Sequence, residues 1–248
     1  MSVWDSIFGP KKTTALPDFL KADMHSHLLP ALDDGSKSVE ESVQLVKHFI
    51  DLGYKKIITT PHIMGDFYKN NPATIQPALQ LVNDALKQQQ IDMQLEVAAE
   101  YYLDEYFIEK LEKDEPLLTF GNNYVLFETS YINESSQLHK AIFLMRSRGY
   151  TPVLAHPERY IYLYHSFDAF KKIYDMDVLF QMNLNALSGY YSKQAKIFSE
   201  KMIDNHMVDF VGTDCHGERH IEATKRSMAT RHFRKLEGLN LLNNSLLS

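Results

Sequence analysis

The stretch FLKADMHSHLLPALDDGSKSVEESVQLVKHFIDLG, residues 19–53, contains one complete strand-and-helix unit. Its first part, residues 19–27, predicts a strand that ends in two histidines. Residues 38–53 predict a helix, because valines recur at three- and four-residue spacing, Ser38 can cap its start and Gly53 can end it. The polar turn DDG lies between the two. The stretch therefore predicts a strand that delivers polar side chains to a loop before an amphipathic helix.

The same alternation of strand and helix recurs along the rest of the chain. Six further strands are predicted at residues 55–62, 93–100, 122–130, 151–159, 178–183 and 207–216. The helices that follow are predicted at residues 74–89, 105–113, 135–149, 166–176, 192–205 and 219–238. Seven such units indicate βαβ crossovers and a parallel sheet. Their regularity favours one α/β domain, a distorted TIM-like (β/α)7 barrel related to the (β/α)8 barrel, over two domains.

The first residues of the chain are expected to form a separate short piece. We predict an N-terminal extension at residues 1–17 and a barrel domain at residues 18–248. The opening residues lack the features of a secretory signal, and no apolar run approaches the roughly 18–20 residues that cross a bilayer. The sequence therefore predicts a cytoplasmic protein without a membrane span.

Composition excludes several classes of protein. The formal net charge of −6 argues against broad electrostatic capture of nucleic acid, which needs a basic face. The single cysteine, Cys215, excludes an internal disulfide and a cysteine-based zinc site. An anionic substrate stays compatible with this charge, because bound metal can reverse the local field.

Most of the predicted strands end in a histidine or a carboxylate. The nine residues at the strand ends are Asp23, His25, His27, His62, Glu100, Glu128, His156, Asp214 and His216, whereas Asp34 lies in the DDG turn after the first strand. In parallel barrels the C-terminal ends of the strands meet on one face, where active sites are found. We therefore expect these nine side chains at one mouth of the barrel.

Each of these residues also has a structural explanation when taken alone. A single histidine after a strand is usually a hydrogen-bonded core or rim residue, and Asp34 is typical of turn chemistry. Glu100 could cap a helix or pair with an arginine. Taken together, however, nine ionisable groups beside apolar strands would be costly to bury without counter-charge. Divalent cations remove that cost, so the set as a whole predicts metal binding.

The residue types restrict the choice of metal. Histidine nitrogen mixed with carboxylate oxygen, and no thiolate, suits manganese, iron or zinc better than calcium or magnesium. Nine ligands are too many for one ion, and three of the carboxylates can bridge neighbouring ions. We expect two or three divalent ions, with manganese preferred and iron or zinc as alternatives.

The motifs DMHSHLLPALDDGSKS, TPH, AAEYYLD, LFE, LAHPERY and GTDCH occur in this order across residues 23–216. Together they resemble the motifs of the PHP (polymerase and histidinol phosphatase) superfamily. The similarity is greatest to its CpsB/CapC-type bacterial protein-tyrosine phosphatases of capsule and exopolysaccharide operons. The resemblance implies the PHP fold, a metal-dependent phosphomonoester hydrolase and a cluster of three metal ions.

The resemblance also implies a role for each site residue. His25, His27, Glu100 and Asp214 would hold one ion. Glu100, Glu128 and His156 would hold a second, and Asp34, His62 and His216 a third. Arg159 in LAHPERY matches the family arginine that grips phosphate, and Arg219 is a candidate for a second arginine. The implied partner is a phosphotyrosine protein, the tyrosine-rich C-terminal tail of a bacterial tyrosine autokinase.

The sequence is also compatible with other functions. A PHP phosphatase for a small metabolite such as histidinol phosphate would share the metal chemistry, whereas a metal-dependent phosphodiesterase or nuclease fits the acidic charge poorly. A non-catalytic, metal-stabilised binding module for the kinase tail is a third alternative. A cysteine-based phosphatase is excluded, because its C-x5-R loop would need arginine where the chain has Ile221.

Overall fold

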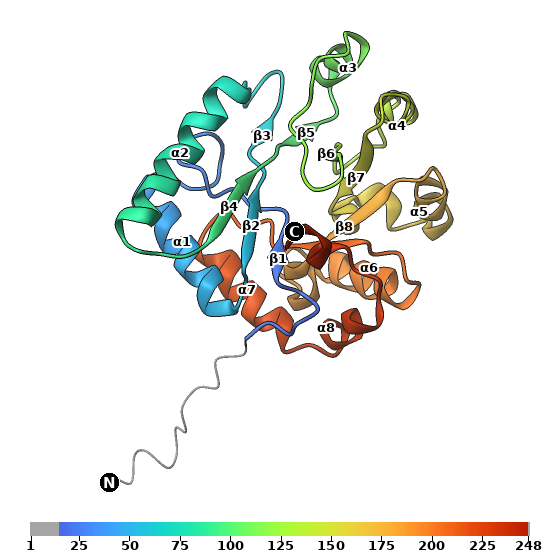
Figure 1. Ribbon diagram of the computed structural model, residues 1–248. Helices are drawn as coiled ribbons and strands as arrows, with labels where there is room; N and C mark the ends of the chain where they lie inside the picture. Colours follow the sequence, from blue (N-terminus) through green and yellow to red (C-terminus); the bar gives the residue numbers. More distant parts are fainter. Residues whose placement is uncertain (1–14, 248) are drawn as a thin grey trace, which may run out of the picture.

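In the described part of the chain, nine short parallel strands occupy the seven strand positions that the sequence predicts. The structure, a computed structural model, describes residues 15–247. Figure 1 shows the strands toward the middle of the molecule and the helices arranged around them. The strands are β1 (Ala22–Asp23), β2 (Lys56–Thr59), β3 (His62–Ile63), β4 (Gln94–Val97), β5 (Glu100–Tyr102), β6 (Tyr124–Glu128), β7 (Thr151–Ala155), β8 (Leu179–Asn183) and β9 (Phe210–Gly212). This arrangement confirms the distorted (β/α)7 barrel.

The second and third predicted strands are each divided into two. One sheet has the order β1-β2-β4 and the other β3-β5-β6-β7-β8-β9. The first division falls at Pro61, which has no N–H group to donate to a neighbouring strand. Pairing continues across the break, because Glu100 N donates to Pro61 O at 3.2 Å. The division therefore bends the barrel wall without interrupting it.

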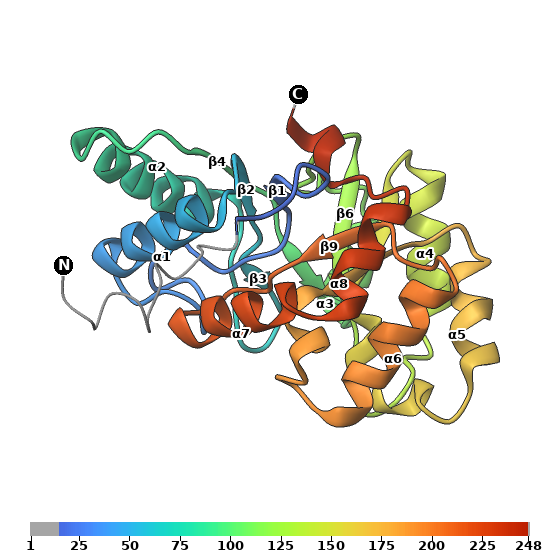
Figure 2. The same cartoon turned by 90° about the horizontal axis from the view of Figure 1, so that it is seen from below.

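Hydrogen bonds between the segments that follow β1 and β9 close the barrel, although these two strands are not paired in one sheet. Asp214 N donates to His25 O at 2.8 Å, and His27 N donates to Cys215 O at 2.9 Å. At the other end, the side chain of Asn243 donates to backbone carbonyls of both strands. The C-terminal segment lies over the middle of the barrel in Figure 1 and at one end of it in Figure 2. One end is therefore covered by this segment.

The helices agree with the sequence prediction except at the C-terminus. They are α1 (Val39–Leu52), α2 (Pro72–Gln88), α3 (Glu105–Glu112), α4 (Leu138–Ser147), α5 (Phe167–Tyr174), α6 (Lys193–Asp204), α7 (Glu218–Met228) and α8 (Arg231–Lys235). Short 3-10 helices are η2 (Pro157–Arg159), η3 (Ile161–Leu163), η4 (Leu184–Ser188), η5 (Leu236–Gly238) and η6 (Asn243–Leu247). The prediction of one helix at 219–238 was wrong, because Thr230 is extended and its side chain caps a new helix by accepting from Phe233 N.

Apolar side chains fill the interior of the barrel below the predicted site. This inner cluster contains Ala22, Met24, Ile58, Ala98, Phe120, Leu126, Val153, Ala155, Phe210 and Leu246. A larger cluster packs between the strands and the surrounding helices. The inner cluster makes a solid floor, so side chains at the strand ends gather above it rather than in an open channel.

The structure bears on two further predictions, the absence of a membrane span and the N-terminal extension. No helix within residues 15–247 is long and apolar enough to cross a membrane. Of the predicted N-terminal extension, residues 1–14 lie outside the described part of the chain. Within the remainder, Leu16 is buried and its N–H donates to Leu52 O at 2.7 Å.

Candidate metal centre

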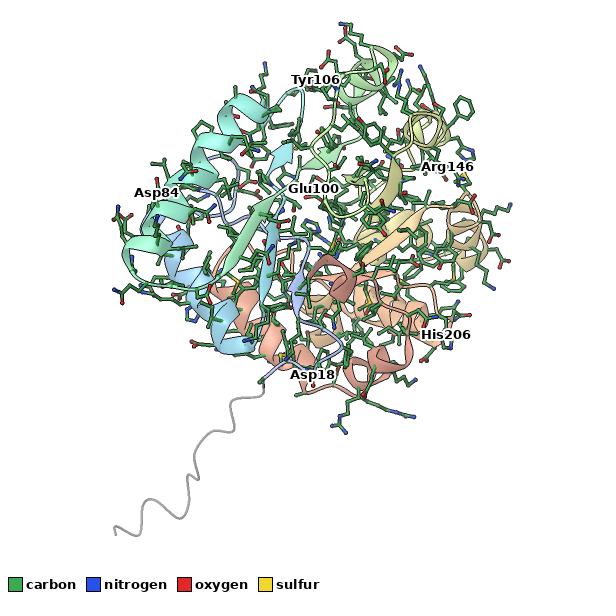
Figure 3. All side chains as sticks on the ribbon, viewed as in Figure 1. Asp18, Asp84, Glu100, Tyr106, Arg146 and His206 are labelled. Carbon is green, nitrogen blue, oxygen red and sulfur yellow. The ribbon has the colours of Figure 1, made fainter. Side chains whose placement is uncertain are left out.

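The nine ligands that the resemblance implies lie together at the mouth of the barrel, whereas the carboxylate of Asp23 accepts hydrogen bonds from Thr213 instead. The potential ligand atoms of the nine form four overlapping groups of three or four, each within 4.8 Å. Figure 3 shows Glu100 near the middle of the barrel, whereas Asp84, Arg146 and His206 lie on the outside. The convergence expected from strand-end positions is therefore present in the fold.

The first group surrounds the inner oxygen of Glu100. Nε2 of His25 lies 3.1 Å from Glu100 Oε2 and Nε2 of His27 lies 3.4 Å from it. Asp214 Oδ1 lies 3.4 Å from the first imidazole and 3.5 Å from the second. These four residues are the set that the resemblance implies for one ion.

Glu100 also contacts the second implied set. Its other oxygen, Oε1, lies 3.0 Å from Nε2 of His156, and that nitrogen lies 3.6 Å from Glu128 Oε2. Glu100 therefore faces two groups of ligands with its two oxygens, which is the arrangement a bridging carboxylate requires.

The third implied set is centred on Asp34. Its Oδ1 lies 3.3 Å from Nε2 of His216 and 3.6 Å from Nε2 of His62. His27 joins this group, because one of its ring nitrogens lies within 4.8 Å of the other three ligand atoms; its ring also stacks on that of His216 at 4.0 Å between centroids. The sets thus share members, and His62 also reaches toward Glu100 and Glu128 through Nδ1.

These separations suit ligands that share an ion. Metal–ligand distances of about 2.1 Å place neighbouring ligand atoms roughly 3.0 Å apart in octahedral and roughly 3.4 Å apart in tetrahedral geometry. Nδ1 of His62 is buried 3.2 Å from Glu100 Oε2, yet it makes no hydrogen bond with it or with any other group described. A buried nitrogen without a hydrogen bond, aimed between Glu100 and Glu128, fits a ligand of the second ion, whereas Nε2 of the same ring faces Asp34 of the third set.

Two residues that the sequence analysis missed orient the HxH pair. Nδ1 of His25 lies 2.7 Å from Gln181 Oε1, and Nδ1 of His27 lies 2.8 Å from Asp33 Oδ2. Each bond turns the opposite nitrogen, Nε2, toward the cluster, as outer partners of metal-binding histidines do. Asp33 was visible as the first aspartate of DDG, whereas nothing in the sequence marked Gln181.

Without a cation between them, the buried carboxylates of the cluster repel one another when both are ionised. Burial, and then the negative charge of Glu100, raise the pKa of Glu128 well above its usual range. Burial would also raise the pKa of Asp214, but His25, His216 and Arg159 hold it well below its usual value. A divalent ion between Glu100 and Glu128 would allow both to be ionised.

The histidines differ in charge state for a physical reason. Burial, followed by the positive charge of Arg159, lowers the pKa of His156 to about 4. Burial acts in the same direction on His25, but the charges of Glu100 and Asp214 outweigh it and raise its pKa to about 9. His156 is thus neutral as metal binding requires, whereas His25 must release a proton.

Two of the predicted ligands sit in the left-handed backbone region. His156 has φ 34° and Asp214 has φ 50°, values that residues with a side chain rarely adopt. Such conformations persist where the surrounding structure imposes them, and they cluster at functional sites. Here His156 directly follows β7 and Asp214 lies two residues after β9. At both positions the left-handed backbone turns the side chain toward the cluster.

Arg159 stands beside the cluster between two aromatic rings. Its Nη1 donates to Asp214 Oδ2 at 2.8 Å. Its guanidinium carbon lies 4.6 Å from the ring centroid of Tyr131 and 4.5 Å from that of Tyr191. The two rings position the guanidinium and contribute cation–π attraction. The two tyrosines come from loops distant in the chain, and the sequence analysis did not single out Tyr131.

The structure separates the two candidate arginines. Arg159 lines a pocket of about 340 Å³ with six of the predicted ligands and with Tyr131, Tyr190, Tyr191 and His220. Arg219 is exposed on α7 and lines a neighbouring hollow with Glu41 and Gln44. Cys215 is buried, and burial raises the pKa of its thiol well above the usual range, as expected for a spacer between ligands.

The fold and the site define the class of protein: an α/β barrel with a histidine–carboxylate cluster at the C-terminal strand ends, as in many metal-dependent hydrolases. Residues 21–239 match the family described as capsular polysaccharide synthesis, CpsB/CapC. This chain belongs to the CpsB/CapC family.

Named relatives and a solved structure agree with that family. Tyrosine-protein phosphatase YwqE of Bacillus subtilis (strain 168) is 27% identical over 220 residues, or 89% of this chain and 83% of that protein. Tyrosine-protein phosphatase CpsB of Streptococcus pneumoniae is 29% identical over 204 residues, or 78% and 82%. A chain from the crystal structures of YwqE and CpsB, described as unique metal-dependent tyrosine phosphatases, has a TM-score of 0.79 at 24% identity, covering 91% of this chain and 94% of its own.

Proposed function

We propose that this chain is a metal-dependent protein-tyrosine phosphatase, which hydrolyses the phosphate ester of phosphotyrosine in a protein. One observation carries the proposal: the guanidinium of Arg159 and six predicted metal ligands line the same pocket. A planar cation beside a histidine–carboxylate cluster suits a phosphate group bound by both. Family membership supports the same activity, because curated relatives bear the name tyrosine-protein phosphatase.

The proposed metal sites are the three sets described above. His25, His27, Glu100 and Asp214 would hold one ion, Glu100, Glu128 and His156 would hold a second, and Asp34, His62 and His216 would hold the third. The separations of 3.0–3.6 Å between their facing atoms support these sets. Manganese is the metal we propose, since the ligands mix nitrogen with hard oxygen.

When bound, divalent ions would supply charge neutralisation and a water of lowered pKa close to the phosphate. The protein's own contribution begins with Arg159, which binds phosphoryl oxygens and neutralises charge that develops on them. Asp214, Tyr131 and Tyr191 fix this guanidinium before substrate arrives, so little reorganisation is needed.

The walls of the pocket suit an aryl phosphate. Tyr131, Tyr190 and Tyr191 present aromatic surface against which a tyrosyl ring can pack. Tyrosine is also a good leaving group, with a pKa of about 10, so the site needs only weak acid assistance to expel it. These features favour phosphotyrosine over phosphate esters of aliphatic alcohols.

We propose a bacterial tyrosine autokinase as the physiological substrate, dephosphorylated in the cytosol on its tyrosine-rich C-terminal tail. The family's connection with capsular polysaccharide synthesis supports this choice. In this role the enzyme would control capsule or exopolysaccharide production by resetting the phosphorylation of the kinase.

The test combines metal analysis with assays on one preparation. Purified protein is analysed for metals, and phosphate release is measured from a phosphotyrosine peptide and from histidinol phosphate. Each assay is repeated after chelation and after manganese is restored. We expect two or three ions per chain, preference for the peptide, loss of activity on chelation and recovery with manganese.

Three results would contradict the proposal. Activity that survives complete metal removal would exclude a metal-dependent mechanism. Preference for histidinol phosphate would identify a metabolite phosphatase. Tight capture of the peptide with no phosphate release in excess manganese would identify a binding module.

A further inference from the structure

A second hollow of about 390 Å³ adjoins the pocket of the metal centre. The two share His62 and Tyr131, and Glu128 also lines the second hollow. The remaining walls come from the loops between β3 and α2 and between β6 and α4, together with Tyr102 of β5 and Asp104 at the start of α3. Both loops follow C-terminal strand ends, so the second hollow opens on the same face as the metal centre.

Large apolar side chains line this second hollow and remain exposed. Phe67, in the first loop, has 79% of its surface exposed, and Ile132, in the second loop, has 64%. Met64 and Tyr102 add apolar surface between them. Exposed apolar side chains that gather beside a polar pocket mark a surface that binds something.

The loop that carries Phe67 is held in place. Gly65 N donates to Asp104 Oδ2 at 2.8 Å, and the same carboxylate caps α3 by accepting from Phe107 N. A Cβ atom on Gly65 would lie 2.9 Å from Cβ of Tyr106, so the loop packs closely against α3. This hollow is therefore formed before any ligand binds.

The loop that carries Ile132 is held in a similar way. Ile132 N donates to Ser130 Oγ at 3.2 Å, and Tyr131 O accepts from Ile161 N at 2.8 Å. Because both loops are anchored, a ligand would lose little free energy to the ordering of loops when it binds.

We propose that the second hollow is a subsite for an apolar side chain next to the phosphotyrosine of a polypeptide substrate, with Phe67 and Ile132 as specificity-determining residues. This inference rests on the proposed phosphatase function. A phosphate at the metal centre fixes the position of its tyrosine, and each further residue of an extended peptide advances about 3.3 Å. A residue one or two positions away therefore reaches the adjoining hollow.

The charge of the hollow adds a second selection. Asp66 and Asp104 both line it, and Asp66 is exposed. Carboxylates beside the apolar surface repel an acidic side chain, which would also lose hydration there. The subsite should thus prefer leucine over alanine and discriminate most strongly against glutamate.

The experiment compares phosphotyrosine peptides that carry leucine, alanine or glutamate at the positions flanking the phosphotyrosine. We measure kcat/KM in manganese, and Kd by calorimetry for the same peptides with a non-hydrolysable phosphonate in place of the phosphate. We expect the leucine peptide to exceed the alanine peptide by about tenfold in both quantities, and the glutamate peptide to be weakest.

Variants assign that preference to this surface. In Phe67→Ser/Ile132→Ser the leucine and alanine peptides should become equivalent, while hydrolysis of p-nitrophenyl phosphate is unchanged. Phe143→Ser is the matched control, because Phe143 is 69% exposed on α4 and does not line either hollow. It should keep the wild-type preference.

Equal Kd values for leucine and alanine peptides in the wild type would overturn the subsite. So would an unchanged preference in Phe67→Ser/Ile132→Ser, or an equal loss in Phe143→Ser. Failure of the proposed function looks different: no phosphate is released from any peptide or from p-nitrophenyl phosphate. The calorimetric comparison then still decides the subsite, because it needs no turnover.

Discussion

Asp214 links the arginine of the site to the histidines. One of its oxygens, Oδ2, accepts a 2.8 Å hydrogen bond from Nη1 of Arg159, and the other, Oδ1, lies 3.4 Å from Nε2 of His25. A single carboxylate therefore sets the distance between the proposed phosphate-binding group and the proposed metal ligands. The two halves of the site are positioned by one residue at the end of the barrel's last strand.

Replacement of the arginine should separate substrate binding from metal binding. In Arg159→Ala we expect kcat/KM for a phosphotyrosine peptide to fall by about 10²–10³, the cost of one lost charge-stabilising group. Metal content, measured by elemental analysis, should stay at the wild-type value. Arg234→Ala, at an exposed position on α8, serves as control. Parallel loss of metal from Arg159→Ala would contradict the role assigned to Arg159.

The aspartate behind His27 should control metal affinity. Asp33 Oδ2 also accepts from His62 N at 3.1 Å, so one carboxylate orients two predicted ligands. In Asp33→Asn we expect manganese affinity to weaken by about 10–100-fold, as for other outer partners of metal-binding histidines. Competition with a calibrated chelator measures it. The exposed Asp92→Asn is the control, and equal affinities in the two variants would exclude this role.

Removal of metal should lower thermal stability. Ions that bind only the folded chain stabilise it by about 4 kcal/mol at a thousandfold excess over Kd. Without them, Glu100 and Glu128 repel one another inside the protein. Calorimetry with chelator should therefore show a lower Tm, which manganese restores and calcium at the same concentration restores less. An equal Tm with and without chelator would mean that the folded protein gains no stability from bound ions.

The DDG turn should tolerate no side chain at its glycine. A Cβ on Gly35 would overlap the backbone oxygen of His27 and lie 2.6 Å from its Cβ. We expect Gly35→Ala to lower the free energy of unfolding by about 1–3 kcal/mol through forced backbone shifts. Chemical denaturation measures this change. Gly238→Ala, where a Cβ would meet nothing within 4 Å, should change stability little; equal effects would refute the packing argument.

Asp209 should make stability depend on pH at a position far from the metal centre. Burial raises its pKa although Phe180 N–H and the Tyr174 hydroxyl donate to it. A pKa raised in the folded state means that its contribution to stability is complete below the unfolded-state pKa of about 3.9 and is lost as pH rises through the folded-state value.

The variant Asp209→Asn cannot ionise and so escapes that loss. Relative to the wild-type value, its free energy of unfolding should increase between pH 4 and pH 7. Urea denaturation of both proteins at the two pH values measures the difference, and all other titrating groups are shared. A difference that is the same at both pH values would show that Asp209 does not titrate as described.

The sequence by itself determined the barrel and the residues at its mouth. Strands of β-branched and apolar residues alternate with amphipathic helices, and local periodicity is enough to find both. Strand ends in a parallel barrel share one face, so His62 in TPH and His156 in LAHPER could be placed together from their position alone. Periodicity did not predict the break at Thr230 within the helix expected at residues 219–238, because the capping role of this threonine depends on a single hydrogen bond.

Only the tertiary structure decided which atoms face one another. Asp33 and Asp34 are indistinguishable in the sequence, yet one orients His27 and the other reaches His216. Tyr131 and Tyr191 flank Arg159 from separate loops, and no local pattern relates them. The physical reason is that periodicity reports which face of an element is buried, whereas partners across the barrel are set by register, twist and loop packing.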